Sequence, residues 1–398
     1  MKSAEQKAKK VPTIRFAGFD DEWVEKKLSE SLILLKDGTH GTHQDAENGP
    51  LLLSAKNIKN GSVNWDESDR RISQEEYDQI HSTFNLKEGD VLLTIVGSIG
   101  ESAVLKNVQG ITFQRSVAFL RPNENLLSDY LCTKIRTTSF QKELDNRKST
   151  SAQPGIYLGD LSQIPFIIAS QKEEQQKIGS FFSNIDSLIS LEQKKYDKLT
   201  QVKKSMLEKM FPKEGATVPE IRFAGFTGDW NVQKASKICS ITTGESNTQD
   251  QVDGGLYPFF IRSDEPVRSN RYLYDEEAVI TIGDGNIGKV FHYVNGKFDL
   301  HQRCYKMSDF KDVLGKYFYY FFSTKFYHRA IKMTAKATVD SVRLEMISEM
   351  DIQYPENLNE QQKIGSYFSH LDSLISLQQR KLEKLKNIKK SLLEKMFV

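Results

Sequence analysis

One stretch of the chain partly matches a phosphate-binding loop. Residues 281–290 read TIGDGNIGKV, in which Gly283, Gly288 and Lys289 fit the G-x-x-x-x-G-K part of the loop that cradles ATP or GTP. The next residue is Val290, where the motif has a metal-holding serine or threonine. β-Branched and aromatic residues flank the stretch, as in strands, whereas a phosphate loop must open a helix whose N-terminal amides face the anion. We therefore predict a strand, a turn and a second strand here.

Other residues that could do chemistry form no complete site. His40, His43 and Asp45 in DGTHGTHQD could hold a metal ion, but a third strong ligand and an H-E-x-x-H context are absent, so a turn or a DNA-facing loop is favoured. Adjacent prolines, G-x-S-x-G and F-x-G-x-G do not occur in the sequence, which argues against an amino-methyltransferase or a serine hydrolase. Three widely spaced cysteines are expected to be reduced, buried thiols: Cys132, Cys239 and Cys304.

The composition is that of a folded protein with several domains. The chain has 398 residues, 38% of them hydrophobic, and a formal net charge of only +2, which weakens any case for strong nonspecific nucleic-acid binding by this chain alone. No apolar run approaches the roughly 20 residues that a membrane span needs. The first ten residues form a basic polar tail without an apolar core. We expect a cytoplasmic protein with no membrane contact.

Two parts of the sequence occur twice. VPTIRFAGFDDEW at 11–23 returns as VPEIRFAGFTGDW at 218–230, and the 36 residues at 176–211, which begin QKIGSFFS, return with few changes at 362–397. Between these anchors the halves diverge, although GSIG at Gly97 matches GNIG at Gly285. The same offset of 188 residues matches Gln114-Arg115 with Gln302-Arg303. Each half therefore predicts a divergent globular domain followed by a long, duplicated segment.

The duplication also argues against a nucleotide site. The first-half counterpart of GDGNIGKV is IVGSIGES, in which Ile95 replaces the first glycine and Glu101 replaces the lysine. A glutamate at that position would repel phosphate. G-x-I-G is therefore expected to be a turn in both halves, with glycines that supply positive φ angles.

Each duplicated segment predicts one long amphipathic helix. Residues 173–210 contain no proline, and their apolar residues recur at spacings of three and four. Two such helices, each roughly 55 Å long, can cover each other as an antiparallel coiled coil, with Glu192, Lys195, Gln378 and Lys381 fixing the register. Two separate helices, each packed on its own domain, are the alternative. The predicted interface residues are Ile178, Phe182, Ile185, Leu188, Leu199, Ile364, Phe368, Leu371, Leu374 and Leu385.

Four leucines lie toward the edge of the apolar stripe or beyond it. They are Leu191 and Leu207 with their mates Leu377 and Leu393. Repeated apolar residues off the main seam indicate a second docking surface for another protein, and a slightly wider seam is the alternative.

The globular halves carry side chains that suit DNA. Arginine fits the O6 and N7 atoms of guanine, asparagine and glutamine fit adenine, and lysine and hydroxyl groups contact phosphates. The candidate DNA-binding residues of the first half are Lys56, Asn57, Arg70, Arg71, Gln114, Arg115, Lys148 and Thr150. Those of the second half are Arg262, Arg268, Arg271, Gln302, Arg303 and Lys336.

The whole chain resembles the specificity subunits of bacterial type I restriction–modification systems. IRFAGFDDEW, DGTHGTH, PLLLSAKNI and GDVLLTIVGSIG carry the resemblance in the first half, YPFFIRSDE and AVITIGDGNIG carry it in the second, and the repeated EQQKIG…DSLISL segments are its most specific part. The resemblance implies two target recognition domains of mixed α/β fold, joined by two long helices that pair as an antiparallel coiled coil in an internal pseudo-two-fold repeat. The implied segments are a flexible tail at 1–10, recognition domains at 11–170 and 218–356, and helical segments at 171–217, with a linker, and at 357–398.

The resemblance also implies a division of labour. The chain itself would catalyse nothing and bind no cofactor or metal. It would read an asymmetric, bipartite target in double-stranded DNA. It would also bind two modification (methyltransferase) subunits and two restriction (motor and nuclease) subunits, which would carry S-adenosylmethionine, ATP and Mg²⁺. A coiled-coil adaptor or inhibitor that binds the modification subunit without reading DNA is the alternative, and an NTP-dependent enzyme is a third.

Overall fold

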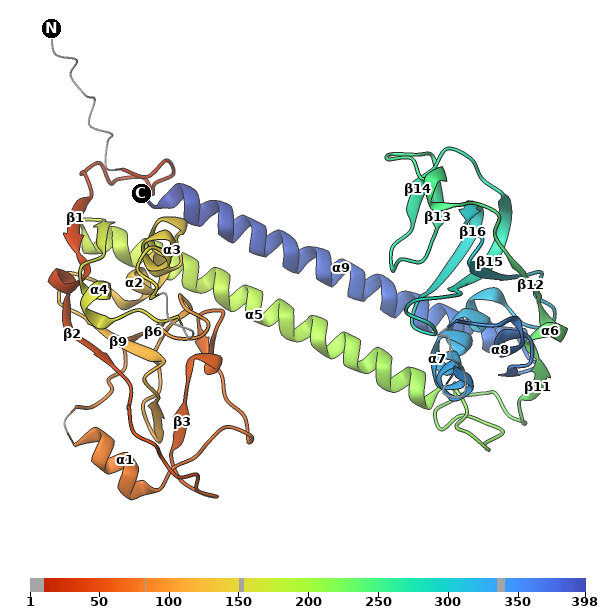
Figure 1. The fold of residues 1–398 in the computed structure, drawn as a ribbon, viewed down its shortest axis with the longest axis horizontal. Coiled ribbons are helices and arrows are strands. Elements are labelled where there is room, and N and C mark those ends of the chain that lie inside the picture. The colour runs from red at the N-terminus through yellow and green to blue at the C-terminus, as the bar shows by residue number, and fades with distance from the viewer. Residues whose placement is uncertain (1–10, 83, 150–153, 335–340) are drawn as a thin grey trace, which may run out of the picture. The chain divides into compact units, whose positions relative to one another are not determined.

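The chain forms two compact units. A computed structural model describes residues 11–82, 84–149, 154–334 and 341–398 (Figure 1). Unit 1 combines the sequence up to Lys194 with Arg380–Val398, and unit 2 is Lys195–Gln379. The units therefore do not follow the two sequence repeats, because each of the two long helices contributes one end to each unit. No helix among the described residues is long and apolar enough to span a membrane.

Unit 1 is built on a four-stranded antiparallel sheet with the strand order β2-β9-β6-β7. Strand β6 is completely buried, since Val91 and Leu93 face the core that contains α2 while Leu92 faces a second core beneath β3 and β8. A strand buried on both faces reads as a continuous apolar run, as VLL does here. The strands are β1 (Val24–Lys27), β2 (Leu32–Asp37), β3 (Leu51–Leu53), β4 (Ile58–Lys59), β5 (Ser62–Val63), β6 (Val91–Thr94), β7 (Ser102–Val104), β8 (Ile111–Phe113), β9 (Val117–Pro122) and β10 (Pro165–Ile168). The helices are η1 (Leu28–Ser31), η2 (Ala55–Asn57), α1 (Gln74–His81), α2 (Ser128–Ile135), α3 (Thr138–Asp145) and α4 (Leu158–Ser162).

Unit 2 repeats this plan with a larger sheet, of order β12-β17-β15-β16-β13-β14. Its first four strands correspond to β2-β9-β6-β7, β13 runs parallel to β16 as β3 does to β8, and β11 pairs with β18 as β1 does with β10. Two copies of a mixed α/β domain are therefore confirmed. The strands are β11 (Asn231–Lys234), β12 (Ser240–Thr243), β13 (Tyr257–Phe260), β14 (Val267–Ser269), β15 (Tyr274–Ile282), β16 (Phe291–Leu300), β17 (Cys304–Ser308) and β18 (Asp351–Tyr354). The helices are α6 (Ala235–Ile238), η3 (Thr248–Asp250), α7 (Gly315–Thr334) and α8 (Leu344–Ser348).

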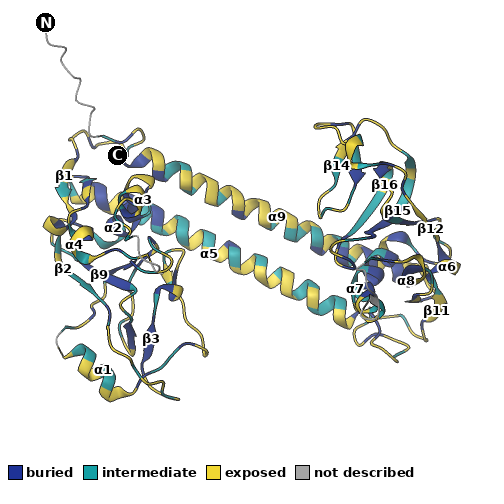
Figure 2. Ribbon diagram, in the orientation of Figure 1, coloured by how far each residue is buried: buried dark blue, intermediate teal, exposed yellow. Residues whose placement is uncertain are grey.

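The duplicated segments are long helices, as predicted. They are α5 (Lys172–Lys209) and α9 (Leu358–Met396), of 38 and 39 residues. Gly179, the only glycine of α5, allows a close approach to α2, because a Cβ atom at this position would lie 2.9 Å from the backbone nitrogen of Tyr130. Much of the middle of both helices is exposed, as Figure 2 shows.

Buried ion pairs tie the first turn of each long helix to its own domain. In unit 1, Arg15 donates two hydrogen bonds of 2.6 and 2.9 Å to Glu174, whose side chain is fully buried. In unit 2, Arg222 contacts the equally buried Glu360 at 2.6 and 2.8 Å. Bidentate arginine–carboxylate pairs are strong and fix geometry. The repeated IRFAGF and EQQKIG motifs are therefore two sides of one joint.

The helices pair in antiparallel fashion within each unit. In unit 1, Lys389 contacts Asp186 and Lys381 contacts Glu192 at 2.9 Å, so higher numbers in α5 meet lower numbers in α9. In unit 2, Lys203 of α5 contacts Asp372 of α9. Asp372 and Lys203 are the sequence mates of Asp186 and Lys389, so the same ion pair forms twice with the helices exchanged. The predicted antiparallel coiled coil and its pseudo-two-fold repeat are confirmed.

The end of each long helix completes the core of the domain opposite to the one in which that helix begins. In unit 1, the ring of Phe397 packs against Trp23, Tyr130 and Phe182 with centroids 5.4 to 6.1 Å apart. In unit 2, its mate Phe211 packs in the same way against residues that include Tyr317, Phe321 and Phe368. The Ile14 amide donates to the Lys395 carbonyl, and the Ile221 amide donates to the Lys209 carbonyl.

The helix interface differs in part from the prediction. Ile178, Phe182, Ile364 and Phe368 are buried in the domain cores as well as against the opposite helix. Leu188 was predicted to lie in the seam but is 40% exposed, so this prediction is wrong: the apolar stripe is broader than the contact it makes.

The edge leucines divide into two pairs. Leu393 is buried and Leu207 packs against the core of unit 2, so both belong to the structure and not to a second surface. Leu191 and Leu377, which are sequence mates, are 50% and 59% exposed.

Candidate functional site

The G-x-I-G stretches are turns between antiparallel strands, as predicted. GSIG joins β6 to β7 and GNIG joins β15 to β16. The first and last glycines of each have positive φ, with 81° and 100° at Gly97 and Gly100 and 83° and 66° at Gly285 and Gly288. No helix opens at the second turn, and the Lys289 ammonium group lies over the ring of Tyr327, 5.5 Å from its centroid. The stretch at 281–290 therefore lacks the geometry of a phosphate loop.

The turn between β15 and β16 places a carboxylate between two arginines. Asp284 accepts a hydrogen bond of 2.9 Å from Nη1 of Arg303, and Nη1 of Arg262 lies 3.2 Å from both of its oxygens. Arg262 follows β13 and Arg303 lies between β16 and β17, so three loops meet at one end of the sheet. The arginine side chains are 44% and 62% exposed and that of Asp284 is 22% exposed.

Backbone contacts fix these loops relative to each other. The Gly283 amide donates to the Arg303 carbonyl at 2.8 Å, and a Cβ atom on Gly283 would lie 2.6 Å from that oxygen, so only glycine permits the approach. The Arg303 amide donates to Nδ1 of the buried His301 at 3.0 Å. Burial, and then the charges of Arg262 and Arg303, lower the pKa of His301, which keeps the imidazole neutral and able to accept this bond.

The carboxyl group at the centre stays ionised. Burial opposes its charge, but hydrogen bonds from Arg303 and Arg262 outweigh burial and hold the pKa of Asp284 below its usual value. One negative and two positive charges leave a net charge of +1 on this cluster.

The other candidates of unit 2 differ in their contacts. Gln302 is exposed and its amide contacts that of Asn247 at 2.5 Å. Arg268 donates to the carbonyls of Gly255 and Leu256, and Arg271 contacts Ser246, Asp250 and Asp299, so both guanidinium groups brace loops of their own domain. Lys336 lies outside the described residues.

The hydrogen bonds correct the predicted equivalence of Gln114-Arg115 with Gln302-Arg303. The Arg115 amide donates to Thr39, as the Gln302 amide donates to Ser246, and the Val117 amide donates to Gln114, as the Cys304 amide donates to His301. The offset is therefore 187 at this loop, one residue less than at the G-x-I-G turns. Arg115 corresponds to Gln302, Ser116 to Arg303 and Val96 to Asp284.

Unit 1 accordingly has different chemistry at the same end of its sheet. A pocket of about 340 Å³ is lined by side chains that include Arg115, Tyr157, Asp37 and His40. Tyr157 is 70% exposed, Arg115 is exposed, and His40 contacts Asp37 at 2.7 Å. This set offers a cation, an aromatic face and an imidazole to a ligand.

Four other predicted residues of unit 1 make internal contacts. Asn57 is buried, and its amide bonds to Ser54, Asn64 and Asp69, so a role in base contact has no support and its place here is structural. Hydrogen bonds from Asn57 and Lys56 lower the pKa of Asp69 to about 2. Arg70 contacts Asp45 and the His43 carbonyl, and Arg71 contacts the Gly49 carbonyl.

The remaining candidates are not brought into one site. Lys148 pairs with Asp145, Gln114 is half-buried, and Thr150 lies outside the described residues. His43 contacts Thr39, while Asp45 faces Arg70, so these side chains do not converge with His40 on a metal. Within the described ranges, no group of three or more His, Cys, Asp or Glu residues could hold a metal ion.

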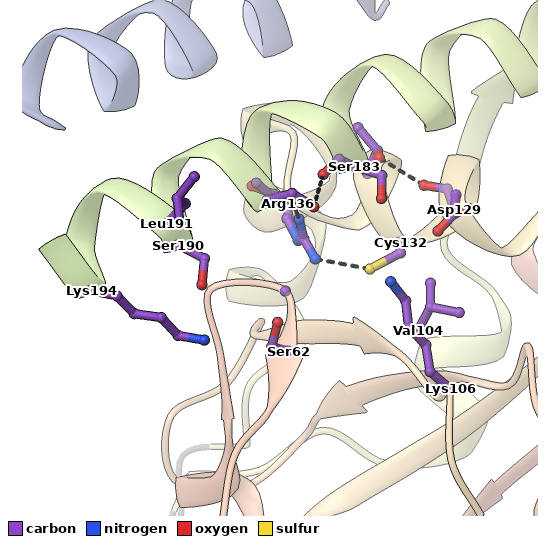
Figure 3. A pocket seen from close by; sticks show the side chains of 14 residues that line it. Ser62, Val104, Lys106, Asp129, Cys132, Arg136, Ser183, Ser190, Leu191 and Lys194 are labelled. Atoms are coloured by element: carbon purple, nitrogen blue, oxygen red, sulfur yellow. Dashed lines mark hydrogen bonds and ion pairs between the residues drawn. The ribbon is translucent and has the colours of Figure 1, made fainter. Parts of the chain in front are cut away.

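A polar groove of about 350 Å³ runs between α5 and the β4–β5 hairpin within unit 1 (Figure 3). At its base Arg136 donates to Asp186 of α5 and contacts the sulfur of Cys132 at 3.0 Å. Burial raises the pKa of the Cys132 thiol and Arg136 only partly opposes this, so the thiol stays protonated. All three cysteines are free and buried, as predicted. Exposed Leu191 and Lys194 form the rim along α5.

Two residues of these surfaces were not predicted. Asp284 lay in the stretch examined for phosphate binding, and its acidic side chain in a GDG turn was the available signal. Tyr157 carried no signal, because an exposed tyrosine cannot be told from a buried one without the fold.

Comparison with known proteins agrees with the fold. The family model described as "Type I restriction modification DNA specificity domain" matches the chain twice, over residues 22–201 and 227–387. A solved S subunit of a type I restriction–modification system from M. genitalium has the same fold, with a TM-score of 0.70 at 15% identity, over 98% of this chain and 99% of that one.

Two curated relatives are similar in sequence. The MjaVIII specificity subunit of Methanocaldococcus jannaschii is 25% identical over 194 residues, which are 47% of this chain and only 45% of that protein. The putative MjaX specificity subunit of the same organism is 21% identical over 403 residues, 94% of this chain and 92% of that protein.

Proposed function

Because the chain belongs to the type I restriction–modification DNA specificity family, and so recognises DNA sequence, we propose that it reads an asymmetric, bipartite duplex target with one half-site per unit. The observation that carries this proposal is the contrast between the two equivalent loop ends. Asp284 with Arg262 and Arg303 occupies the end in unit 2, and Arg115 with Tyr157 occupies it in unit 1. Two domains with one fold and different side chains at the same place would prefer different bases.

The paired helices are proposed to set the unread spacer between the half-sites. Each helix is continuous across both units, and ion pairs hold the pair in register in each. Readers held at a fixed separation select half-sites at a fixed spacing, since base pairs advance along the duplex in regular steps.

The same helices are proposed to serve as a scaffold. Leu191 and Leu377 are exposed sequence mates on α5 and α9, so the duplication offers an equivalent apolar contact point on each helix. Two modification subunits would dock through these positions and two restriction subunits would join them. In this proposal S-adenosylmethionine, ATP and Mg²⁺ are bound by those partners, and this chain is not catalytic.

The test is a selection from random duplexes, using the full chain with its modification subunit. Sequencing the bound fraction is expected to give two short, unlike half-sites at one spacing. Exchange of residues 218–356 for the domain of another family member should change one half-site only. If bound duplexes show no common sequence while the modification subunit still binds, the chain is an adaptor and not a reader.

A further inference from the structure

We infer that Arg303 reads a guanine in the half-site of unit 2, and that Asp284 is the residue that positions it. This inference rests on the proposed function and adds the identity of one base and the device that selects it. Arg262 shares the carboxylate and completes the cluster.

The guanidinium group of Arg303 is exposed to solvent, but its ion pair with Asp284 holds it in place. The Arg303 side chain is 62% exposed, while the Asp284 carboxylate that holds its Nη1 group is only 22% exposed and anchored in a tight turn. Among the described residues, the side chain of Arg303 makes its hydrogen bond to Asp284 through Nη1, and Nε and Nη2 share another edge of the guanidinium plane, which is the edge we assign to the ligand. Guanine presents O6 and N7 side by side in the major groove, and a planar guanidinium group donates to both.

The carboxylate favours a base edge over a phosphate as the partner. A phosphate bound by Arg303 would come close to Asp284, and like charges at such distances repel. The O6 and N7 atoms of guanine are neutral acceptors, so the carboxylate only orients the donor. Arg262 offsets the negative charge, which leaves the cluster at +1 and still attractive to DNA.

Because Asp284 fixes the side chain of Arg303 before DNA binds, the preference for guanine over other bases is expected to be stronger. A flexible interface side chain loses about 0.5–1.5 kcal/mol of entropy when it is immobilised. Here that ordering has already taken place, through Asp284 and through the backbone bonds of Arg303 to Gly283 and His301. Unit 1 has Ser116 and Val96 at the positions of Arg303 and Asp284, so this device belongs to one half-site only.

The test compares four chains, each with the modification subunit, in the random-duplex selection. They are the wild type, Arg303→Lys, Asp284→Asn and the control Asp351→Asn. Arg303→Lys keeps the charge and loses the planar fork. Asp351 is an exposed carboxylate of unit 2 that pairs with Lys234 at 2.7 Å, so Asp351→Asn removes the same charge away from the cluster.

We expect the wild type to require guanine at one position of one half-site. Arg303→Lys should lower that preference about tenfold or more and leave the salt dependence of binding unchanged. Asp284→Asn should lower the preference by about 2- to 12-fold, which is the entropy range above. It should also tighten binding to unrelated DNA, because a negative charge is lost. Asp351→Asn should keep the guanine preference.

Several results would overturn the inference while the proposed function stands. One is a wild-type target without a guanine that depends on Arg303. A fifth chain, Arg303→Ala, gives another: a uniform loss of affinity with a salt slope smaller by about one would make Arg303 a phosphate contact. The half-site of unit 1 and the melting temperatures serve as internal controls for folding. If the wild type selects no sequence at all, the proposed function itself fails.

Discussion

Removal of Arg15 should destabilise unit 1 far more than the loss of a surface ion pair would. Glu174 is fully buried and accepts hydrogen bonds of 2.6 and 2.9 Å from Arg15 and one of 3.1 Å from Nε1 of Trp23. In Arg15→Ala the carboxylate keeps only the indole, and an uncompensated buried charge costs about 3–5 kcal/mol. We therefore expect the free energy of unfolding of unit 1 to fall by about 3 kcal/mol or more.

Urea unfolding followed by Trp23 fluorescence measures this loss. Trp65 and Trp230 are replaced by phenylalanine in every protein compared, so that the signal comes from the joint itself. The matched control is Arg222→Ala, which breaks the equivalent pair with Glu360 in unit 2 and should leave the Trp23 transition in place. Arg15→Met combined with Glu174→Leu should recover part of the stability, since a buried pair can be replaced by apolar groups at little cost but the Trp23 indole loses its acceptor. A loss below about 1 kcal/mol in Arg15→Ala would refute the reasoning.

Three further perturbations have defined outcomes. Burial lowers the pKa of Lys134 to about 8, so the unfolded chain holds this proton more tightly and stability should rise from pH ~8 to ~9.5; melting temperatures of Lys134→Met across this range should lack that rise. Gly179→Ala should lower the melting temperature despite a helix propensity better by about 1 kcal/mol, because its Cβ meets α2, whereas the control Gly159→Ala has open space and should not. Leu191→Glu with Leu377→Glu should weaken binding of the modification subunit in a pull-down without changing the melting temperature, and unchanged binding would exclude this docking surface.

The duplication and the long helices could be predicted because their signals are local. Spacings of three and four residues specify a helix wherever the segment lies, and near-identical copies predict the same structure twice. The residues that lie between the two helices were harder to predict, as Leu188 shows, because the exposure of a residue depends on which residues of the other helix face it. The choice between a docking surface and a wider seam for Leu393 could not be made from sequence for a related reason: most residues of the core that buries it lie more than 180 positions earlier.

The candidate recognition residues could be predicted only by residue type. Arg303 and Arg262 were identified by their chemistry, but Asp284, which joins them, comes from a third loop that only the fold brings near. Asn57 had suitable chemistry and proved to be internal, because a short polar side chain serves a buried turn as well as a base edge. The register at Gln114 was off by one residue, since a single-residue shift between two loops leaves no mark in sequences this divergent.

The packing of Phe397 has a consequence for synthesis on the ribosome. The slot beside Trp23 and Tyr130 belongs to the first domain to be translated, yet its native occupant follows Phe211 by 186 residues, or roughly 10–40 s at 5–20 residues per second. Until the end of α9 has been translated, the nascent first domain therefore lacks the side chain that packs against Trp23 and Tyr130 in the folded chain.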